Sequence, residues 1–144
     1  GGLKYAFENG NEAHGEWIFQ EAGYSPSENT DFWTAFSSRD LLQLSYFAAN
    51  SRRAEKLGLD FMGQQYLLAS LRVPDAFKYK DWTIYARMLF SAQDASNAAY
   101  LSSESALGSE GTLLFSCAAT GGAAISELRG LWAYSLMAGY KRTF

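Results

Sequence analysis

The stretch that most constrains the fold runs from Arg53 to Leu71 and reads Arg-Ala-Glu-Lys-Leu-Gly-Leu-Asp-Phe-Met-Gly-Gln-Gln-Tyr-Leu-Leu-Ala-Ser-Leu. This pattern is typical of a helix that ends at Leu57-Gly58, a short link, and a second helix that opens at Gly63. Glycine readily adopts the left-handed backbone that commonly follows a helix. The spacing therefore favours tightly connected helices.

The composition favours the same fold class. The chain holds 21 Ala and 17 Leu against one Val, three Ile and six Thr, and helices favour the first pair whereas strands favour β-branched residues. We therefore expect an all-α protein, a compact bundle of about five helices. A strand alternative rests on the alternation of Trp132, Tyr134, Leu136, Ala138 and Tyr140 before Phe144, which is typical of the closing strand of an outer-membrane barrel. The composition argues against that alternative.

The expected elements follow from caps and stops. Ser37 suits the N-cap of the first strong helix, and Gly58 suits the position just past its end. Val73-Pro74 ends the second helix, because proline restricts the residue before it. Residues 1–36 are expected to form an aromatic-rich N-terminal arm and residues 37–144 the helical domain. The predicted helices cover residues 38–57, 63–72, 82–101, 111–119 and 123–138, with a short one at 16–22 and connections at 74–81 and 102–110.

The helix stops and leucines of this stretch resemble the repeat of the Clp N-terminal domain, the small helical module of Clp/Hsp100 chaperones and of the stand-alone ClpT-type accessory proteins. A weaker copy covers residues 108–115 and continues through 121–128, so the resemblance spans roughly residues 37–138. The Glu-His pair of the family repeat is Gln65-Tyr66 here. The matching residues are Ala54, Leu57, Gly58, Gly63, Leu67, Leu68 and Leu71.

This resemblance implies a non-enzymatic protein–protein interaction module that docks on a large complex such as a plastid Clp protease, in the plastid stroma. The start at Gly1 is compatible with a removed transit peptide. One alternative is an accessory soluble subunit of a photosynthetic complex, such as a photosystem, that uses the same fold. Another is a small-ligand-binding or enzymatic helical bundle.

The candidate partner-binding residues fall into two groups. Aromatic side chains of the arm could anchor it on a partner, since such residues are enriched at interface centres, or they could pack on the bundle. By the resemblance, two further residues are the nearest survivors of a pocket for degradation tags. The candidates are Trp17, Phe19, Phe32 and Trp33 in the arm, and Thr83 and Glu110 in the helical domain.

Other classes of function lack a motif. Cys117 has no histidine near it in sequence, so we interpret it as a small buried hydrophobe rather than a nucleophile. His14 has no partners at metal-ligand spacing, and we expect no catalytic residue, cofactor or metal. The net charge of −3 gives no basic footprint for nucleic acid. No apolar run reaches the roughly 18–20 residues of a membrane helix, so we expect no membrane span and leave peripheral attachment to a membrane complex open.

Overall fold

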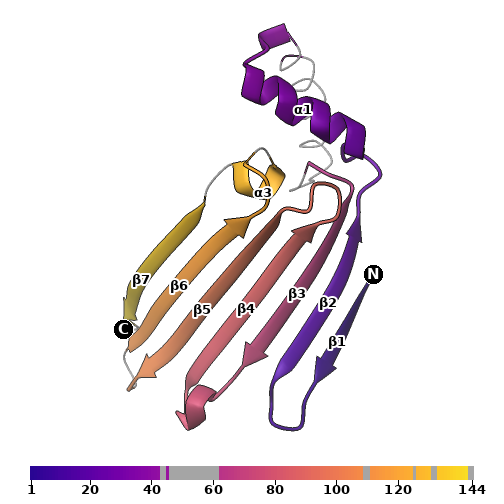
Figure 1. The fold of residues 1–144 in the computed structure, drawn as a ribbon. Coiled ribbons are helices and arrows are strands. Elements are labelled where there is room, and N and C mark those ends of the chain that lie inside the picture. The colour runs from indigo at the N-terminus through magenta and orange to yellow at the C-terminus, as the bar shows by residue number, and fades with distance from the viewer. Residues whose placement is uncertain (43–44, 46–61, 109–110, 125, 131–132, 143–144) are drawn as a thin grey trace.

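The computed structural model describes residues 1–42, 45, 62–108, 111–124, 126–130 and 133–142. Its dominant feature is one sheet of seven strands, with two helices beyond one end of the strands (Figure 1). The strands are β1 (Gly2–Ala6), β2 (Glu12–Phe19), β3 (Gln65–Val73), β4 (Trp82–Ser91), β5 (Asn97–Leu107), β6 (Gly111–Gly121) and β7 (Tyr134–Arg142). The helical elements are α1 (Pro26–Ser38), the single 3₁₀ turn η1 (Ala76–Lys78) and α3 (Glu127–Gly130).

The sheet is an antiparallel meander, in which each strand pairs with its neighbours in the sequence. Leu71, for example, faces Ala86, which faces Leu101 on the next strand, and Cys117 and Leu136 continue the series. Side chains of one face therefore form straight rows across all the strands. Because successive residues point to opposite faces, this register fixes which side chains share a surface.

The predicted all-α bundle is wrong, because the described chain is mostly strand. Ala and Leu have helical preferences, but propensity is a weak prior that tertiary context routinely overrides. Here the period-two pattern and the pairing of neighbouring strands decide the fold. The strand alternative for the last segment is confirmed over residues 134–142, where β7 carries the predicted alternation.

The predicted helices correspond to other elements. The segment 63–72 is mostly β3, and Val73-Pro74 ends a strand instead of a helix. The segment 38–57 lies largely outside the described residues, as does Gly58. Ser37 is not an N-cap but lies in the last turn of α1. The other predicted segments also differ. The predicted helix 16–22 lies mostly in β2, the predicted helix 82–101 forms β4 and part of β5, and the predicted loop from 102 continues β5 to Leu107. The predicted helix 111–119 lies in β6, and the predicted helix 123–138 holds α3 and part of β7.

Helix α1 begins where its local chemistry supplies caps. The hydroxyl of Ser25 accepts the amide of Glu28 at 3.4 Å, and Oε2 of Glu28 accepts the amide of Ser25 at 2.8 Å, which completes a capping box. Pro26 stands at the start, where its missing N–H costs nothing. Arg39 ends the helix in a left-handed conformation with φ of 57°.

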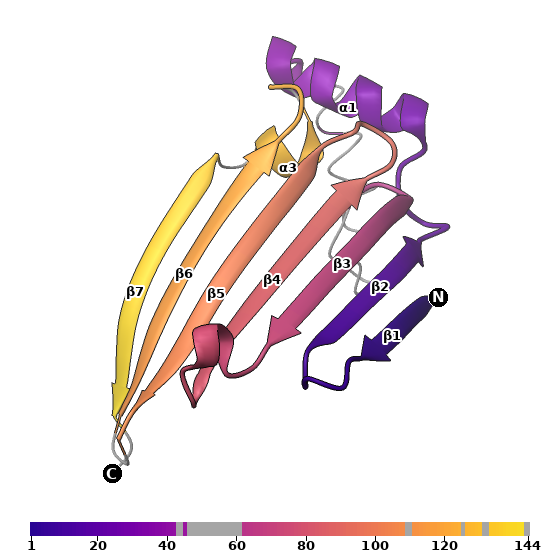
Figure 2. The same ribbon diagram turned by 60° about the horizontal axis from the view of Figure 1, so that its bottom comes forward.

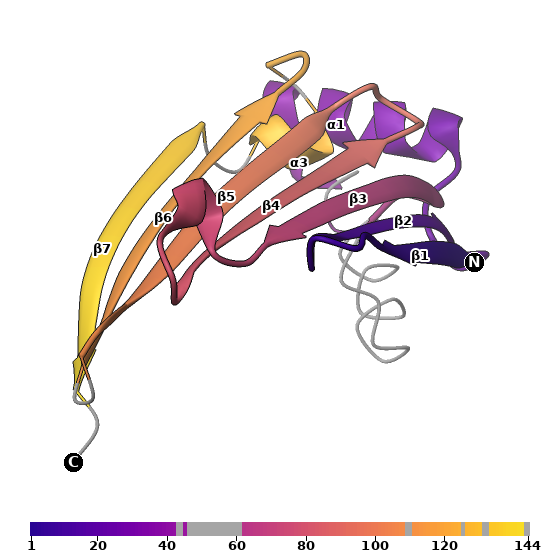
Figure 3. The same cartoon turned by 90° about the horizontal axis from the view of Figure 1, so that it is seen from below.

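The described part of the chain forms a single layer over most of the sheet. The two helices stay near one end of the strands in both views (Figures 1 and 2), and the view from below shows the sheet curving across its width from β1 to β7 (Figure 3). Fully buried hydrophobic side chains are correspondingly few, and α1 supplies Trp33 and Ala35 among them. A sheet normally buries at least one face against another layer, so the surfaces of this sheet bear directly on function.

Candidate functional site

One face of the sheet, called here the apolar face, carries almost no polar side chain. The charged exception is Arg142, at the very end of β7. Polar uncharged residues lie mainly near strand ends, as Gln65 and Asn97 do. From β1 to β7 the other members of this face include Leu3, Tyr5, Ala13, Gly15, Trp17, Phe19, Leu67, Ala69, Leu71, Val73, Trp82, Ile84, Ala86, Met88, Phe90, Ala99, Leu101, Leu113, Phe115, Cys117, Ala119, Tyr134, Leu136, Ala138 and Tyr140.

The opposite face, called here the polar face, carries nearly all of the charge in the strands. Serine, threonine and tyrosine separate its charged residues, with some aliphatic side chains such as Leu68 and Leu89 among them. This segregation means that the two faces meet different surroundings. The charged or histidine side chains of the polar face are Lys4, Glu12, His14, Glu16, Arg72, Arg87, Glu104 and Lys141.

The apolar face is exposed in the described structure. Leu3 is 84% exposed, Tyr134 82% and Leu136 72%. Among the described strand residues, the large hydrophobic side chains that are exposed on the polar face are Tyr100 and Met137, and the others lie on the apolar face. Contiguous exposed apolar patches of this extent mark a binding surface for protein or membrane.

Aromatic side chains of the apolar face gather toward the two ends of the strands. Toward the end that carries α1 lie Trp17, Phe19, Phe90 and Tyr134, and toward the other end lie Tyr5, Trp82 and Tyr140. The rings of Phe77 and Tyr79, in the connection after β3, each pack on Trp82 with centroids 5.9 Å away. The middle of the face is instead rich in Ala, Leu and Met, with Phe115 on β6 as an aromatic exception.

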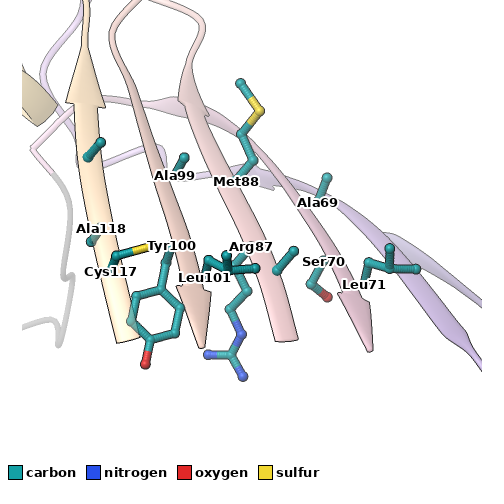
Figure 4. Close-up of a pocket in the computed structure, with 12 residues that line it drawn as sticks. Ala69, Ser70, Leu71, Arg87, Met88, Ala99, Tyr100, Leu101, Cys117 and Ala118 are labelled. Carbon is teal, nitrogen blue, oxygen red and sulfur yellow. The ribbon is translucent and has the colours of Figure 1, made fainter. Parts of the chain in front are cut away.

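A hollow of about 500 Å³ lies over the middle of β3–β6 and is lined mainly by residues of the apolar face. The surface is hollowed there because four alanines carry small side chains: Ala69, Ala86, Ala99 and Ala119. Figure 4 shows Met88, Ala69 and Ala99 projecting to one side, while Arg87 and Tyr100 project to the other. The hollow offers apolar contact and no charged group of its own face, so it suits a hydrocarbon chain better than a polar ligand.

The polar face holds a second hollow, of about 300 Å³, over β1–β4. Lys4 Nζ lies 3.1 Å from a carboxylate oxygen of Glu12, and Arg72 approaches the same carboxylate at 4.0 Å. The Arg72 guanidinium also lies 5.9 Å from the ring centroid of Tyr85. Arg87 is exposed and has no carboxylate partner among the described residues. The hollow therefore has a surplus of positive charge.

A buried polar network connects three chain segments beyond the strand ends. Tyr66 donates its hydroxyl hydrogen to Oε2 of Glu127 at 2.6 Å, and Oε1 of Glu127 accepts the amide of Met62 at 2.7 Å. The amide of Glu127 in turn donates to Asp94 at 2.8 Å, and Asp94 accepts the hydroxyl of Ser96 at 2.6 Å. These contacts tie the residues before β3, the β4–β5 turn and α3 together.

Burial sets the protonation of this network. Loss of hydration raises the pKa of Glu127 above its ordinary value, against hydrogen bonds from Tyr66 and Met62. Burial, followed by the adjacent Glu127 carboxylate, also raises the pKa of Tyr66, which keeps this phenol protonated. Burial acts to raise the pKa of Asp94 as well, but hydrogen bonds from Ser96 and from the Glu127 amide outweigh it and lower that pKa.

The sequence-based candidates lie apart from these polar sites. Trp17 and Phe19 lie on the apolar face of β2, and both are exposed. Phe32 and Trp33 contact each other on α1, with centroids 5.1 Å apart, and Trp33 is buried. Thr83 lies on the polar face of β4, opposite Glu104. Glu110 lies outside the described residues.

Sequence reasoning missed both polar sites. The signals for the polar-face hollow were present as alternation, since Glu12, His14 and Glu16 are each separated by a small or apolar residue in β2. No comparable signal links Tyr66 to Glu127, which are 61 positions apart. Cys117, interpreted from sequence as buried, is half-buried on the apolar face.

No known family model, curated protein or solved structure matches the chain. Within the described ranges, no group of three or more His, Cys, Asp or Glu side chains is arranged to hold a metal ion. None of the helices in the described part of the chain has the length and apolar character needed to cross a bilayer.

Proposed function

We propose that the sheet forms part of the wall of a transmembrane β-barrel, with the apolar face against lipid and the polar face toward a water-filled interior. The observation that carries this proposal is the segregation of charge. From β1 to β7, one face holds seven charged side chains and a histidine, and the other holds Arg142 at a strand end. Alternation of apolar and polar residues is the pattern of strands between lipid and lumen.

Strand length supports the same assignment. Strands β3 to β7 contain 9 to 11 residues each, and a transmembrane strand needs about 9–11 residues when it is tilted. Aromatic residues concentrated near both strand ends, with mostly Ala, Leu and Met between them, match the two interfacial girdles of such barrels. Strands that are buried in an ordinary protein core do not require aromatic residues in two bands near the strand ends.

A protein partner explains the apolar face less well. Protein interfaces have a polar rim around an apolar centre, whereas this face remains uncharged in almost every row of the sheet. The two longest connections also lie at the same strand end. Residues 7–11, 74–81 and 108–110 link strands at one end, and residues 20–64, 92–96 and 122–133 do so at the other. Short turns on one side and longer loops on the other are typical of outer-membrane barrels.

The proposal requires that the edges of the sheet be paired. In hydrocarbon no water is present to satisfy backbone N–H and C=O groups, so open sheet edges do not occur there. Strands β1 and β7 are the two edges in the described structure. Each must therefore pair with a further strand so that the wall closes.

The docking role implied by the Clp resemblance stays a prediction, because neither the comparisons nor the structure bears on it. Its plastid location and its candidate partners stay predictions as well. In the described part of the chain, the segments expected to form helical docking faces are mostly strands. The membrane proposal instead rests on the arrangement of side chains that those strands create.

The chain's single cysteine offers a direct test. Cys117 lies in the middle of β6 on the apolar face, and Ser102 lies on the polar face of β5. An environment-sensitive dye would be attached to Cys117, or to a cysteine at position 102 in the double variant Cys117→Ser, Ser102→Cys. After reconstitution into liposomes, brominated acyl chains should quench the dye at 117, and aqueous iodide should quench the dye at 102.

Two outcomes would overturn the proposal. If iodide quenches the dye at 117 as strongly as it quenches the free dye in solution, the apolar face contacts water. If neither quencher reaches that dye, a protein surface or a second copy covers the face.

A further inference from the structure

We infer that the polar-face hollow is a binding site for an oxyanion group, a carboxylate or phosphate carried by a small solute. The inference rests on the proposed function, because that function gives the polar face its water-filled space. The central residue is Arg87, whose guanidinium has no carboxylate partner among the described residues.

The register brings the cationic groups together. Arg87 faces Ser70 on β3, Ser70 faces His14 on β2, and His14 faces Lys4 on β1, which makes one row across four strands. In the adjacent row Arg72 lies between Glu12 and Tyr85. Neighbouring strands lie about 4.8 Å apart, so these groups surround a space that suits a small solute.

Charge balance determines the sign of the ligand. The lining of this hollow holds three permanent cations, Lys4, Arg72 and Arg87, against one carboxylate, Glu12. That carboxylate already contacts Lys4 and Arg72. The two remaining carboxylates on the polar face, Glu16 and Glu104, are absent from the lining. The surplus charge therefore lies at Arg87.

The donor chemistry favours an oxyanion over a halide. A guanidinium offers a planar fork that matches two oxygens of a carboxylate or phosphate. The hydroxyls of Ser70 and Tyr85 line the same hollow and supply further neutral donors. Rings of Arg and Lys are the usual lining of pores that pass anions and phosphate.

The test is calorimetric titration of the full chain in detergent micelles with inorganic phosphate, at low and at moderate salt. Wild-type protein should bind phosphate, and Arg87→Gln should weaken binding roughly tenfold or more, as expected for loss of a charged hydrogen-bond partner. Arg87→Lys should fall between the two, because it keeps the charge and loses the fork. Lys141→Gln is the matched control, since it removes one cation from the polar face outside the hollow.

The outcomes separate this inference from the membrane proposal. If wild-type protein binds no phosphate, or if Arg87→Gln and Lys141→Gln bind it as tightly as wild type, the oxyanion site is wrong even where the dye at Cys117 lies in lipid. If phosphate binding depends on Arg87 while that dye contacts water, the site stands and the membrane proposal falls. Circular dichroism of each variant verifies that the sheet is retained.

Discussion

The hydroxyl of Tyr66 lies 2.6 Å from Oε2 of Glu127 and accepts the amide of Gly63 at 2.5 Å. Tyr66 is fully buried and Glu127 is 5% exposed. The Tyr66 hydroxyl thus links Gly63, just before β3, to α3, the helix between β6 and β7 in the sequence. Because both groups are shielded from water, each depends on the other for its hydrogen bonds.

Tyr66→Phe should destabilise the protein by about 1–3 kcal/mol, because it leaves a buried carboxylate oxygen and a buried amide without this partner. Urea unfolding in detergent micelles measures the change. Tyr100→Phe is the control, since Tyr100 is exposed on the polar face and no hydrogen bond of its hydroxyl occurs in the described structure. Equal stability of the two variants would show that the Tyr66 contact contributes nothing.

The raised pKa of Glu127 predicts a pH dependence. The folded protein holds this proton more tightly than the unfolded chain does, so stability is greatest below the ordinary pKa of 4.5 and falls as pH rises through the folded pKa. Glu127→Gln should abolish that fall. Asp94 and Glu28, whose pKa values are lowered, lose their contributions as pH falls below their ordinary 3.8 and 4.5, so the difference between wild type and Glu127→Gln isolates Glu127.

The measurement is the unfolding midpoint of wild type and of Glu127→Gln at each pH. The wild-type midpoint should decline relative to that of the variant as pH increases. Parallel profiles would mean that Glu127 titrates alike in the folded and unfolded states.

A charge on the apolar face should oppose membrane insertion. Ala86→Lys places an ammonium in the middle of β4 on that face, and the expected cost is about 2–4 kcal/mol at the bilayer midplane. Ala118→Lys makes the same substitution on the polar face of β6 and should insert like wild type. Folding titrations in lipid vesicles compare the two. Similar insertion by both variants would contradict the assignment of the lipid-facing side.

The start of α1 should depend on Ser25. Ser25→Ala removes the hydroxyl that caps the helix and should destabilise its first turn by about 1 kcal/mol. Hydrogen exchange of the peptide amides in residues 27–31 reports that local change. Ser37→Ala is the comparison, because its hydroxyl bonds the carbonyl of Thr34 inside the helix. Faster exchange at the first turn in Ser37→Ala than in Ser25→Ala would mean that the helix starts elsewhere.

Part of the fold was readable from local pattern. The alternation of Tyr134, Leu136, Ala138 and Tyr140 predicted a strand, and β7 confirms it. The Ala and Leu content favours helices instead. This prediction fails because β-propensity depends strongly on context, and the apolar face accepts any apolar side chain, Ala and Leu included.

The leucines that suggested a helical repeat show the same ambiguity. Leu67 and Leu71 lie on the apolar face of β3, whereas Leu68 lies on the polar face. Short apolar runs cannot be assigned to helix or strand by periodicity alone. The polar-face hollow can be predicted only when the strand register is known. Lys4 and Arg87 line the same hollow only because four strands pair between and including β1 and β4.

The period-two segregation of the two faces has a genetic consequence. Loss of one codon within β5 would shift every later residue of that strand to the opposite face, so that Ser102 and Glu104 would exchange sides with Leu101 and Ser103. Loss of two codons would preserve the sides and shorten the strand. Insertions and deletions inside the strands should therefore survive selection in even numbers, while the connections beyond the strand ends accept any number.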